Sequence, residues 1–342
     1  MHTTTHNGIS RRGLFKVSAA LLAGASGLAA LPKQLLAAPV EGRLATLIDL
    51  SRCDGCAGRP QPACVTSCKQ EKNPTVPMPV DPIPSPFPTN IIEDWSKKQE
   101  VADRLTPYNR IFVQKAQVTV NGKAQTISIP RRCMHCDNPA CATICPFSAN
   151  TKDKNSAVVI DQELCFGGAK CKTVCPWKIP QRQSGVGLYL KVAKEFMGNG
   201  VMYKCDLCID RLKDGKAPAC MEACPKQAML IGPRDQIYAE AEKRAAAIGG
   251  HIFGKQENGG TATLYVSPVP FEELDRQLSP ASADPKQGQP QLKPGVTRKM
   301  AESDGMAKAV LAAPAIGLVA GLVGAFSRLS QRKAENAGKE SR

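Results

Sequence analysis

The chain of 342 residues contains 15 cysteines, and they fall into four groups with regular internal spacing. The first and fourth groups are Cys53, Cys56, Cys64 and Cys68, and Cys205, Cys208, Cys220 and Cys224. The second and third are Cys133, Cys136, Cys141 and Cys145, and Cys165, Cys171 and Cys175. Three groups end in Cys-Pro, at Pro146, Pro176 and Pro225. Thiolates at such spacings are metal ligands, and iron–sulfur clusters and zinc both use them.

Iron–sulfur clusters explain the pattern better than zinc does. In two-cluster bacterial ferredoxins, runs of this kind give three cysteines to one cluster and the fourth to its neighbour. Four runs therefore predict four clusters in two exchanging pairs, which is the layout of an electron conduit. A structural zinc protein is the alternative, because paired Cys-x2-Cys motifs also suit zinc. The Cys-Pro endings and the staggered fourth ligands argue against it.

The composition fits a chain that depends on metal ligation. Aromatic residues make up only 5% and there are 27 prolines, so a large conventional core is difficult to build. The length suggests about two domains. Ligation free energy is also folding free energy, and clusters can therefore supply the missing cross-links.

The net charge of +15 would permit binding to nucleic acid or anionic lipid. Part of it lies in an acid-free leader that contains Arg11, Arg12, Lys16 and Lys33. The rest carries no RNA-binding or helix-turn-helix signature. We therefore expect no nucleic-acid partner.

Residues 1–38 predict a twin-arginine (Tat) export signal. Arg11 and Arg12 follow Ser10 and precede a mild apolar stretch, residues 17–31, and a small-residue region that ends at Ala38. A chance Arg-Arg in a disordered N-terminus is the alternative, and Pro39 leaves cleavage near Ala37 open. Exported cysteines normally form disulfides. Clusters are assembled in the reducing cytoplasm, so export in the folded state reconciles the two signals.

Near the other end, residues 309–326 form an uncharged run of 18 residues. That length meets the lower limit for a transmembrane helix, which we place at 309–327; a buried soluble helix is the alternative. Arg328, Arg332 and Lys333 follow it, and the positive-inside rule then predicts a cytoplasmic tail at 328–342. The bulk of the chain is expected on the periplasmic side of the bacterial inner membrane, anchored in lipid.

The segments between the two ends predict short strands around the cysteine groups. Strands are expected at 44–50, 157–160, 201–204 and 228–231, and a helix at 235–248 that ends at Gly249. Residues 110–129 read as a β-hairpin, because Asn121-Gly122 stands between alternating apolar runs. A proline-dense loop is expected at 74–88, and a tether at 281–300.

Two stretches, RRCMHCDNPACATICP at 131–146 and KCDLCIDRLKDGKAPACMEACP at 204–225, carry a family resemblance. The chain resembles the four-cluster ferredoxin-like subunits of respiratory oxidoreductases, such as the β subunit of formate dehydrogenase and the dimethyl sulfoxide reductase iron–sulfur subunit. The leader and the C-terminal helix look most like the hydrogenase-associated member. The resemblance implies an α+β fold of tandem bacterial-ferredoxin-like (βαββαβ-type) domains with a β-hairpin insertion and one C-terminal transmembrane helix.

The same resemblance implies domain boundaries and ligand sets. One domain would combine 44–109 with 201–270, the other would span 110–200, and a tether would follow at 271–308. Three [4Fe-4S] clusters would be held by Cys53, Cys56, Cys64 and Cys224; by Cys205, Cys208, Cys220 and Cys68; and by Cys133, Cys136, Cys141 and Cys175. A fourth site would have Cys165, Cys171 and Cys145 alone, with Gly168 where a ligand is expected.

The sequence departs from the family pattern at two groups. Gly168 keeps the loop length but removes one thiolate, which predicts a [3Fe-4S] cluster of raised potential. A [4Fe-4S] cluster with water or another donor is the alternative. In the first group, seven residues separate Cys56 from Cys64, where two are usual, and Lys69 replaces a proline. We expect the extra residues to loop out without displacing the thiols.

No residue pattern indicates a catalytic site of its own, so we expect a subunit and not an enzyme. His135 is interpreted as a neighbour of the ligands or a surface residue, not as a zinc ligand, and Trp177 as a shield against water. The expected function is electron relay between a catalytic oxidoreductase subunit and a membrane quinone-reactive or cytochrome b subunit. The catalytic partner is expected to be a [NiFe] hydrogenase or, next, a molybdopterin enzyme such as formate dehydrogenase. The sequence does not determine the partner, the direction of electron flow, the cluster potentials or the quinone.

Overall fold

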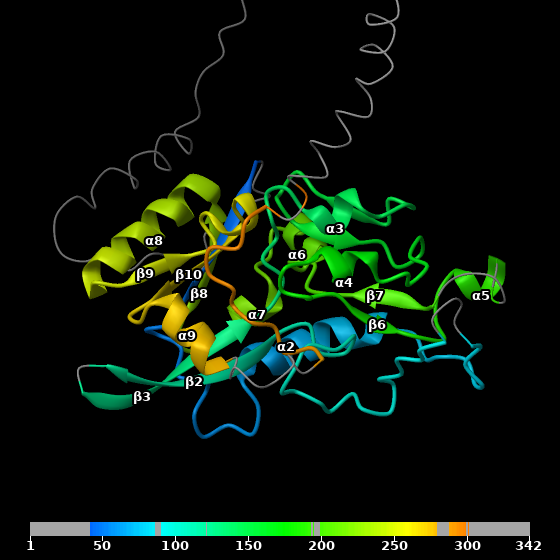
Figure 1. Cartoon of the computed structure of the whole chain (residues 1–342), viewed down its shortest axis with the longest axis horizontal. Coiled ribbons are helices and arrows are strands. Elements are labelled where there is room, and N and C mark those ends of the chain that lie inside the picture. The colour runs from blue at the N-terminus through cyan, green and yellow to red at the C-terminus, as the bar shows by residue number, and fades with distance from the viewer. Residues whose placement is uncertain are drawn as a thin grey trace, which may run out of the picture. The chain divides into compact units, whose positions relative to one another are not determined.

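The computed structural model describes residues 42–85, 90–120, 122–192, 194, 199–278, 287–298 and 300 (Figure 1). Contacts divide the chain into Met1–Leu35 and Leu36–Arg342, and every described residue belongs to the second unit. The predicted export signal, the predicted transmembrane helix and the predicted tail lie outside the described residues. Within the described ranges, no helix has the length and apolar character needed to cross a membrane.

A four-stranded sheet in the order β8-β1-β10-β9 joins segments from both ends of the described chain. Its strands are β1 (Leu44–Asp49), β8 (Met229–Pro233), β9 (His251–Phe253) and β10 (Thr263–Ser267). Strand β1 pairs antiparallel with β8 and parallel with β10, while β9 pairs antiparallel with β10. The strands predicted at 44–50 and 228–231 are therefore confirmed.

Every residue of β1 is buried, because both faces of the sheet are covered. Helix α8 (Arg234–Ile248) lies on one face and packs Ile237, Ala241 and Ala245 against Ala45 and Leu47. Leu44 and Ile48 point to the other face, as the alternation along a strand requires, and join the core around the cysteine loops. The predicted helix at 235–248 is confirmed, and Gly249 ends it in the left-handed conformation, with φ +56°.

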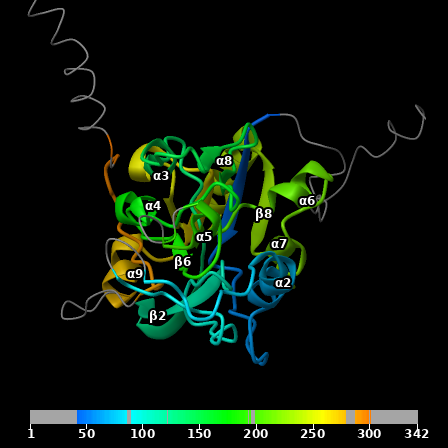
Figure 2. The same cartoon turned by 90° about the vertical axis from the view of Figure 1, so that its right-hand side faces the viewer.

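Each cysteine group follows a short strand and runs into a short helix. The first three strand–helix units are β1 with α2 (Ala63–Lys72), β3 (Lys123–Arg131) with α3 (Ala140–Thr143), and β5 (Val158–Ile160) with α4 (Lys170–Val174). The fourth is β7 (Val201–Tyr203) with α6 (Ile209–Lys213) and α7 (Ala219–Glu222). Helix α2 packs against α7, and α3 packs against α4 (Figure 2). The first group therefore lies beside the fourth, and the second beside the third.

Two small ladders and a hairpin complete the frame. Strand β4 (Asn150–Lys152) pairs antiparallel with β5, and β6 (Gln181–Gln183) pairs antiparallel with β7. The predicted hairpin is confirmed: β2 (Phe112–Val120) and β3 pair in register, with Gly122 at φ +76° in the two-residue turn. The remaining short elements are η1 (Asn73–Thr75), α5 (Tyr189–Val192) and η2 (Glu257–Gly259).

A repeated turn closes the second, third and fourth groups after their Cys-Pro. The third residue beyond the last cysteine has positive φ, and its N–H donates to the carbonyl of that cysteine. These bonds run from Ser148 to Cys145, from Lys178 to Cys175 and from Gln227 to Cys224, at 3.2, 3.0 and 3.2 Å. In the first group Lys69 stands where proline would, and α2 continues to Lys72. Proline would remove a helical N–H and disfavour the helix, so the substitution accounts for the longer helix.

The described residues of the predicted tether are packed on the protein body. Helix α9 (Phe271–Leu278) lies along β2 with Phe271 and Leu274 buried. Residues 287–298 form no helix or strand but are held by backbone bonds, from the N–H of Leu105 to Gly288 and from the N–H of Asn258 to Val296, both 2.7 Å. Leu292 is fully buried in the main core. We call 287–298 the strap.

Candidate iron–sulfur sites

Two cavities beneath α2 and α7 are each lined by four cysteines. Cys53, Cys56, Cys64 and Cys224 line the first cavity. Cys68, Cys205, Cys208 and Cys220 line the second. In each cavity three cysteines come from one group and the fourth comes from the other group. The structure therefore brings together the two ligand sets that the sequence analysis expected for these groups.

The second and third groups converge in the same exchanged manner. The thiol of Cys136 is close enough to Cys133, Cys141 and Cys175 to interact electrostatically with all three. Cys165 interacts in this way with Cys145, and Cys171 with Cys165. Cys171 also interacts with Cys141 of the neighbouring set, so these two sets adjoin. We name the four sets after the cysteine given first for each ligand set above: the Cys53, Cys205, Cys133 and Cys165 sites.

Burial makes these thiols poor acids. It raises the pKa of Cys53 and Cys208 to about 11, and the pKa of Cys64, Cys171 and Cys175 to about 12. Neighbouring thiolates add to the increase, because gathering negative charge in one place is unfavourable. Cluster ligands are thiolates, so binding of a cationic iron core must displace these protons. A cavity that collects buried thiols has the donor set that such a core needs.

Hydrogen-bond donors point at sulfur in all four sites. Backbone amides donate to sulfur from Ala63 to Cys56 at 3.5 Å, and from His135 to Cys133, Met202 to Cys165 and Ala228 to Cys224 at 3.4 Å. At the Cys205 site the donors to Cys205 Sγ are side chains: Arg132 Nη1 at 3.9 Å and His135 Nε2 at 3.6 Å. Such donors stabilise thiolate sulfur, so the residues present fit iron–sulfur clusters.

Buried cations surround the Cys205 and Cys133 sites. Lys72 Nζ lies 2.8 Å from Asp206 Oδ2, and Arg110 lies 3.7 Å from the same atom. Burial opposes the charge of Asp206, yet these two cations keep the pKa of Asp206 below its usual value. Burial also opposes the charge of Lys204, and the thiols of Cys133, Cys141 and Cys205 outweigh it and raise the pKa of Lys204.

The loop between Cys165 and Cys171 has room for a fourth ligand. Gly168 is exposed, and a Cβ built on it meets no atom within 4 Å. Its neighbour Gly167 differs, because it has φ +69° and a Cβ there would lie 2.5 Å from the Gly200 carbonyl oxygen. Glycine is therefore sterically required at 167 but not at 168. The missing thiolate at 168 is a chemical difference and not a packing constraint.

The long insertion in the first group lies at the surface. Residues 57–60 are exposed, while Cys56 and Cys64 line the same cavity. The extra residues thus loop out, as expected, and the thiols stay together. Lys69 has an additional contact, because its Nζ donates to the carbonyls of Gln99, Glu100 and Val101 at 2.9–3.0 Å.

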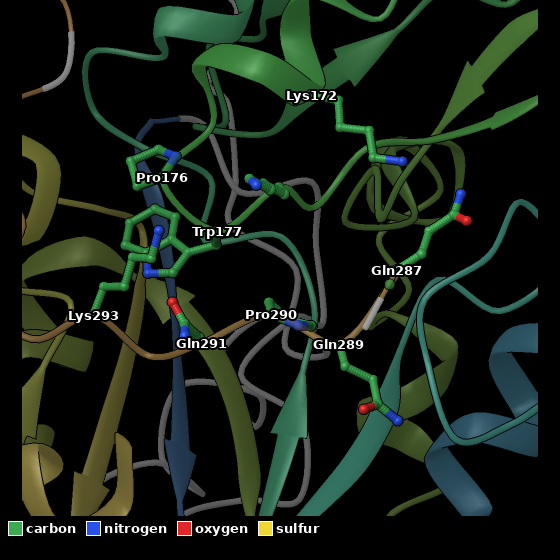
Figure 3. Close-up of a pocket in the computed structure, with 10 residues that line it drawn as sticks. Lys172, Pro176, Trp177, Gln287, Gln289, Pro290, Gln291 and Lys293 are labelled. Atoms are coloured by element: carbon green, nitrogen blue, oxygen red, sulfur yellow. The ribbon is translucent and has the colours of Figure 1, made fainter. Parts of the chain in front are cut away.

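Trp177 lies beneath the strap. Its Nε1 donates to the Leu292 carbonyl at 2.7 Å, its ring meets Phe253 edge-on at 6.4 Å, and only 2% of its surface is exposed. A pocket opens beside it, with Trp177, Pro176 and Lys293 at one end and Lys172 and Gln287 at the other (Figure 3). Trp177 belongs to the turn after Cys175 and the strap covers it, while its role as a shield against water stays a prediction.

Sequence reasoning left His135 open between a neighbour of the ligands and a surface residue, and it missed the other polar residues around the thiols. Among the described residues, no three His, Cys, Asp or Glu side chains converge on a single-ion site; the thiols line wider cavities. His135 is fully buried between two of the sites, and burial together with Lys204 and Arg132 holds its pKa well below 6.5. The asparagine at 258 bonds Cys136, which is 122 positions away in the sequence. Nothing in the residue spacing indicated these contacts, because they join residues far apart in sequence.

Comparison with known proteins places the cysteine groups in two matched regions. Two family models described as "4Fe-4S dicluster domain" match residues 124–234 and 52–149. The chain is 30% identical over 316 residues to "Hydrogenase-2 operon protein HybA" of Escherichia coli O157:H7, covering 78% of this chain and 83% of the relative.

Two further relatives share a shorter region. One of the chains of the anaerobic dimethyl sulfoxide reductase of Escherichia coli K12 is 30% identical over 194 residues, covering 56% of this chain and 73% of the relative. One of the subunits of the sulfite dehydrogenase of Allochromatium vinosum is 32% identical over 197 residues, covering 56% of this chain and 68% of the relative.

Proposed function

Because the chain belongs to the family of 4Fe-4S dicluster, ferredoxin-like electron-transfer subunits, we propose that it relays electrons along four adjoining sites between two partner subunits. As a member of this family it is the electron-transfer subunit of an oxidoreductase and not the catalytic one. The observation that carries the proposal is the exchange of the last cysteine between groups, which gathers fifteen thiols into four sets.

The order of the sites follows from their contacts. The Cys53 and Cys205 sites adjoin because α2 and α7 pack together and exchange Cys68 and Cys224. His135 and Arg132 connect the Cys205 site with the Cys133 site. Cys141 and Cys171 connect the Cys133 site with the Cys165 site. Iron–sulfur clusters supply one-electron redox chemistry at thiolate sites, and this chain's residues hold, space and hydrogen-bond those thiolates.

The proposed content is three [4Fe-4S] clusters and one [3Fe-4S] cluster. The first three would have four cysteines each, and the [3Fe-4S] cluster would be held by Cys165, Cys171 and Cys145. The exposed Gly168, with open space around it, supports the assignment, since no side chain there supplies a ligand. A three-iron cluster with fewer thiolates is expected to have the raised potential that delivery toward a quinone needs.

The compartment and the partners are proposed from the sequence. Arg11-Arg12 and the apolar run at 309–326 support Tat export and anchoring on the periplasmic side of the inner membrane. The similarity to a hydrogenase-2 operon protein supports a hydrogenase, which we propose to be of the [NiFe] type, as the catalytic partner. The dimethyl sulfoxide reductase and sulfite dehydrogenase relatives keep a molybdopterin enzyme as the second candidate. An integral quinone-reactive or cytochrome b subunit would complete the complex.

Metal analysis of the full chain, purified without oxygen, tests the proposal. We expect brown protein with about 15 irons per chain, the content of three four-iron clusters and one three-iron cluster. The oxidised protein should show an isotropic EPR signal near the free-electron g value. Colourless protein with stoichiometric zinc would overturn the proposal. If the clusters are present, co-purification with the products of neighbouring genes would identify the catalytic and membrane partners.

A further inference from the structure

The relay has two halves, the Cys53 and Cys205 sites and the Cys133 and Cys165 sites. We propose that His135 is the bridge between these halves: it hydrogen-bonds to thiolates of two different sites and raises the reduction potential of the Cys205 site. The inference rests on the proposed function, because it requires that both sites hold clusters. It assigns a specific role to a residue that is not itself a ligand.

The two hydrogen bonds leave His135 from opposite ends. Its backbone N–H donates to Cys133 Sγ at 3.4 Å, and its Nε2 lies 3.6 Å from Cys205 Sγ. Cys133 and Cys205 belong to different sites and are 72 positions apart in the sequence. The left-handed backbone of His135, with φ +48°, is uncommon for a residue with a side chain. Gly55, Gly167 and Leu207 stand at the same position of the other three groups and also have positive φ, so the conformation belongs to the cysteine loop and the ring contact is what distinguishes His135.

The hydrogen bond at Nδ1 determines which ring nitrogen carries the proton. The backbone N–H of Val158 donates to Nδ1 at 2.9 Å, so Nδ1 must be the lone-pair nitrogen. In a neutral imidazole the hydrogen then lies on Nε2, which faces Cys205 Sγ as a donor. The Ala262 N–H bonds the His135 carbonyl at 2.9 Å and fixes the other end of the residue. His135 is fully buried, so these bonds are shielded from bulk solvent.

Two neighbouring cations, Arg132 and Lys204, also stabilise negative charge on Cys205 Sγ. Arg132 donates to Cys205 Sγ and to the carbonyl of Cys133, so it spans the same two sites. Lys204 is held by the carbonyls of Val158 and Cys205. Within the described ranges, Cys205 thus receives two side-chain donors, whereas Cys56, Cys133, Cys165 and Cys224 receive backbone amides.

Donors and positive charge at a thiolate favour the more negative, reduced state of the site. The Cys205 site should therefore accept an electron more readily than the same four thiolates would without His135. The bridge also offers a short path, because a single residue joins the two sulfurs through two hydrogen bonds. An electron passing between the sites breaks no bond, and Nε2 keeps its proton.

Redox titration of the full chain, monitored by EPR, tests the role of the ring. In His135→Leu, one [4Fe-4S] signal is expected at a lower midpoint potential, with the other midpoints unchanged. His135→Gln places an amide donor near the Nε2 position and should recover part of the shift. His251→Leu is the matched control, since His251 is exposed on β9 and should change no midpoint. Unchanged midpoints in His135→Leu, or equal shifts in His135→Leu and His135→Gln, would contradict the bridge.

A second measurement keeps His135 unchanged, so it tests the inference even if the His135 variants lose their iron. The chain has 4 histidines, so replacing His2, His6 and His251 by glutamine leaves His135 alone. With ¹⁵N in the imidazole rings, the reduced protein should show hyperfine coupling between a cluster and a ring nitrogen. A loaded protein without that coupling would disprove the inference and leave the proposed function intact. A protein that contains no clusters would instead refute the function.

Discussion

Replacing Gly168 with cysteine is expected to convert the Cys165 site from three irons to four. The structure allows the side chain at no steric cost, because a Cβ at 168 meets nothing within 4 Å and the backbone there is not left-handed. The change of unfolding free energy should stay within about 1 kcal/mol, the usual effect of replacing glycine at a compatible position. Iron content should increase by about one per chain, because the new thiolate completes a four-cysteine set.

The assay is EPR of the oxidised protein together with iron and sulfide analysis. The isotropic signal of a [3Fe-4S] cluster should be largely lost in Gly168→Cys, and a reduced-state [4Fe-4S] signal should replace it. Gly168→Ala is the matched control, since it adds the same Cβ without a thiol and should keep the isotropic signal. If Gly168→Cys and Gly168→Ala retain the same signal and iron content, the three-iron assignment to this loop is wrong.

Three further changes probe the frame around the sites. Gly200→Ala should destabilise the protein by several kcal/mol, as measured by chemical denaturation. The φ of Gly200 is +116°, and the new Cβ would overlap the Gln183 carbonyl oxygen. If alanine is tolerated, the close approach of β6 and β7 at this point is wrong. Trp177→Phe should cost about 1–3 kcal/mol, because it leaves the Leu292 carbonyl unpaired. It should also speed cluster loss in urea relative to a control variant at an exposed residue, Val192→Ala. Lys69→Met should increase proteolysis at residues 99–101, because the Lys69 ammonium bonds the carbonyls of these residues. A cleavage rate equal to that of the unmodified chain would show that other contacts fix the loop.

Removal of iron should have a larger effect than any of these substitutions. Cys64, Cys68 and Cys220 belong to the main core, and burial raises the pKa of each thiol above its usual value. Chelation leaves the two thiol-lined cavities without the cross-links that close them. We expect loss of cooperative unfolding in the iron-free chain, measured by circular dichroism against the loaded protein. A cooperative transition unchanged by chelation would show that the fold is independent of metal.

The elements close to the cysteines could be predicted because local chemistry determines them. The turn at Gly122 sets the hairpin register, the left-handed Gly249 ends α8, and the Cys-Pro endings stop three of the four helices that carry group cysteines. The set memberships of Cys68 and Cys224 came from the family resemblance, and spacing alone would have left them open. The structure gathers them as that resemblance implied.

The contacts that sequence could not supply join distant segments. The strap reads as a proline- and glutamine-rich tether, yet the Trp177 ring and the backbone of Leu105 hold it against the core. No local pattern records that Leu292 is buried, because the residues that bury it belong to other elements. The position of His135 between two sites has the same origin. A Cys-x2-Cys motif indicates the ligands of one site, but the residues that approach this site from the other half of the protein depend on how the two halves pack.

Two different features of this chain are expected to raise the potential at two points along the relay. At the Cys165 site a thiolate is missing, which lowers the negative charge of the ligand set. At the Cys205 site all four thiols are present, and their charge is compensated by Arg132 and His135 from the adjoining half and by Lys204 from the same segment. The first feature depends on one position in a surface loop, while the second depends on packing between the two halves. Substitution of Gly168 should therefore leave the Cys205 site unchanged, and the His135→Leu shift should persist at full size in the Gly168→Cys background.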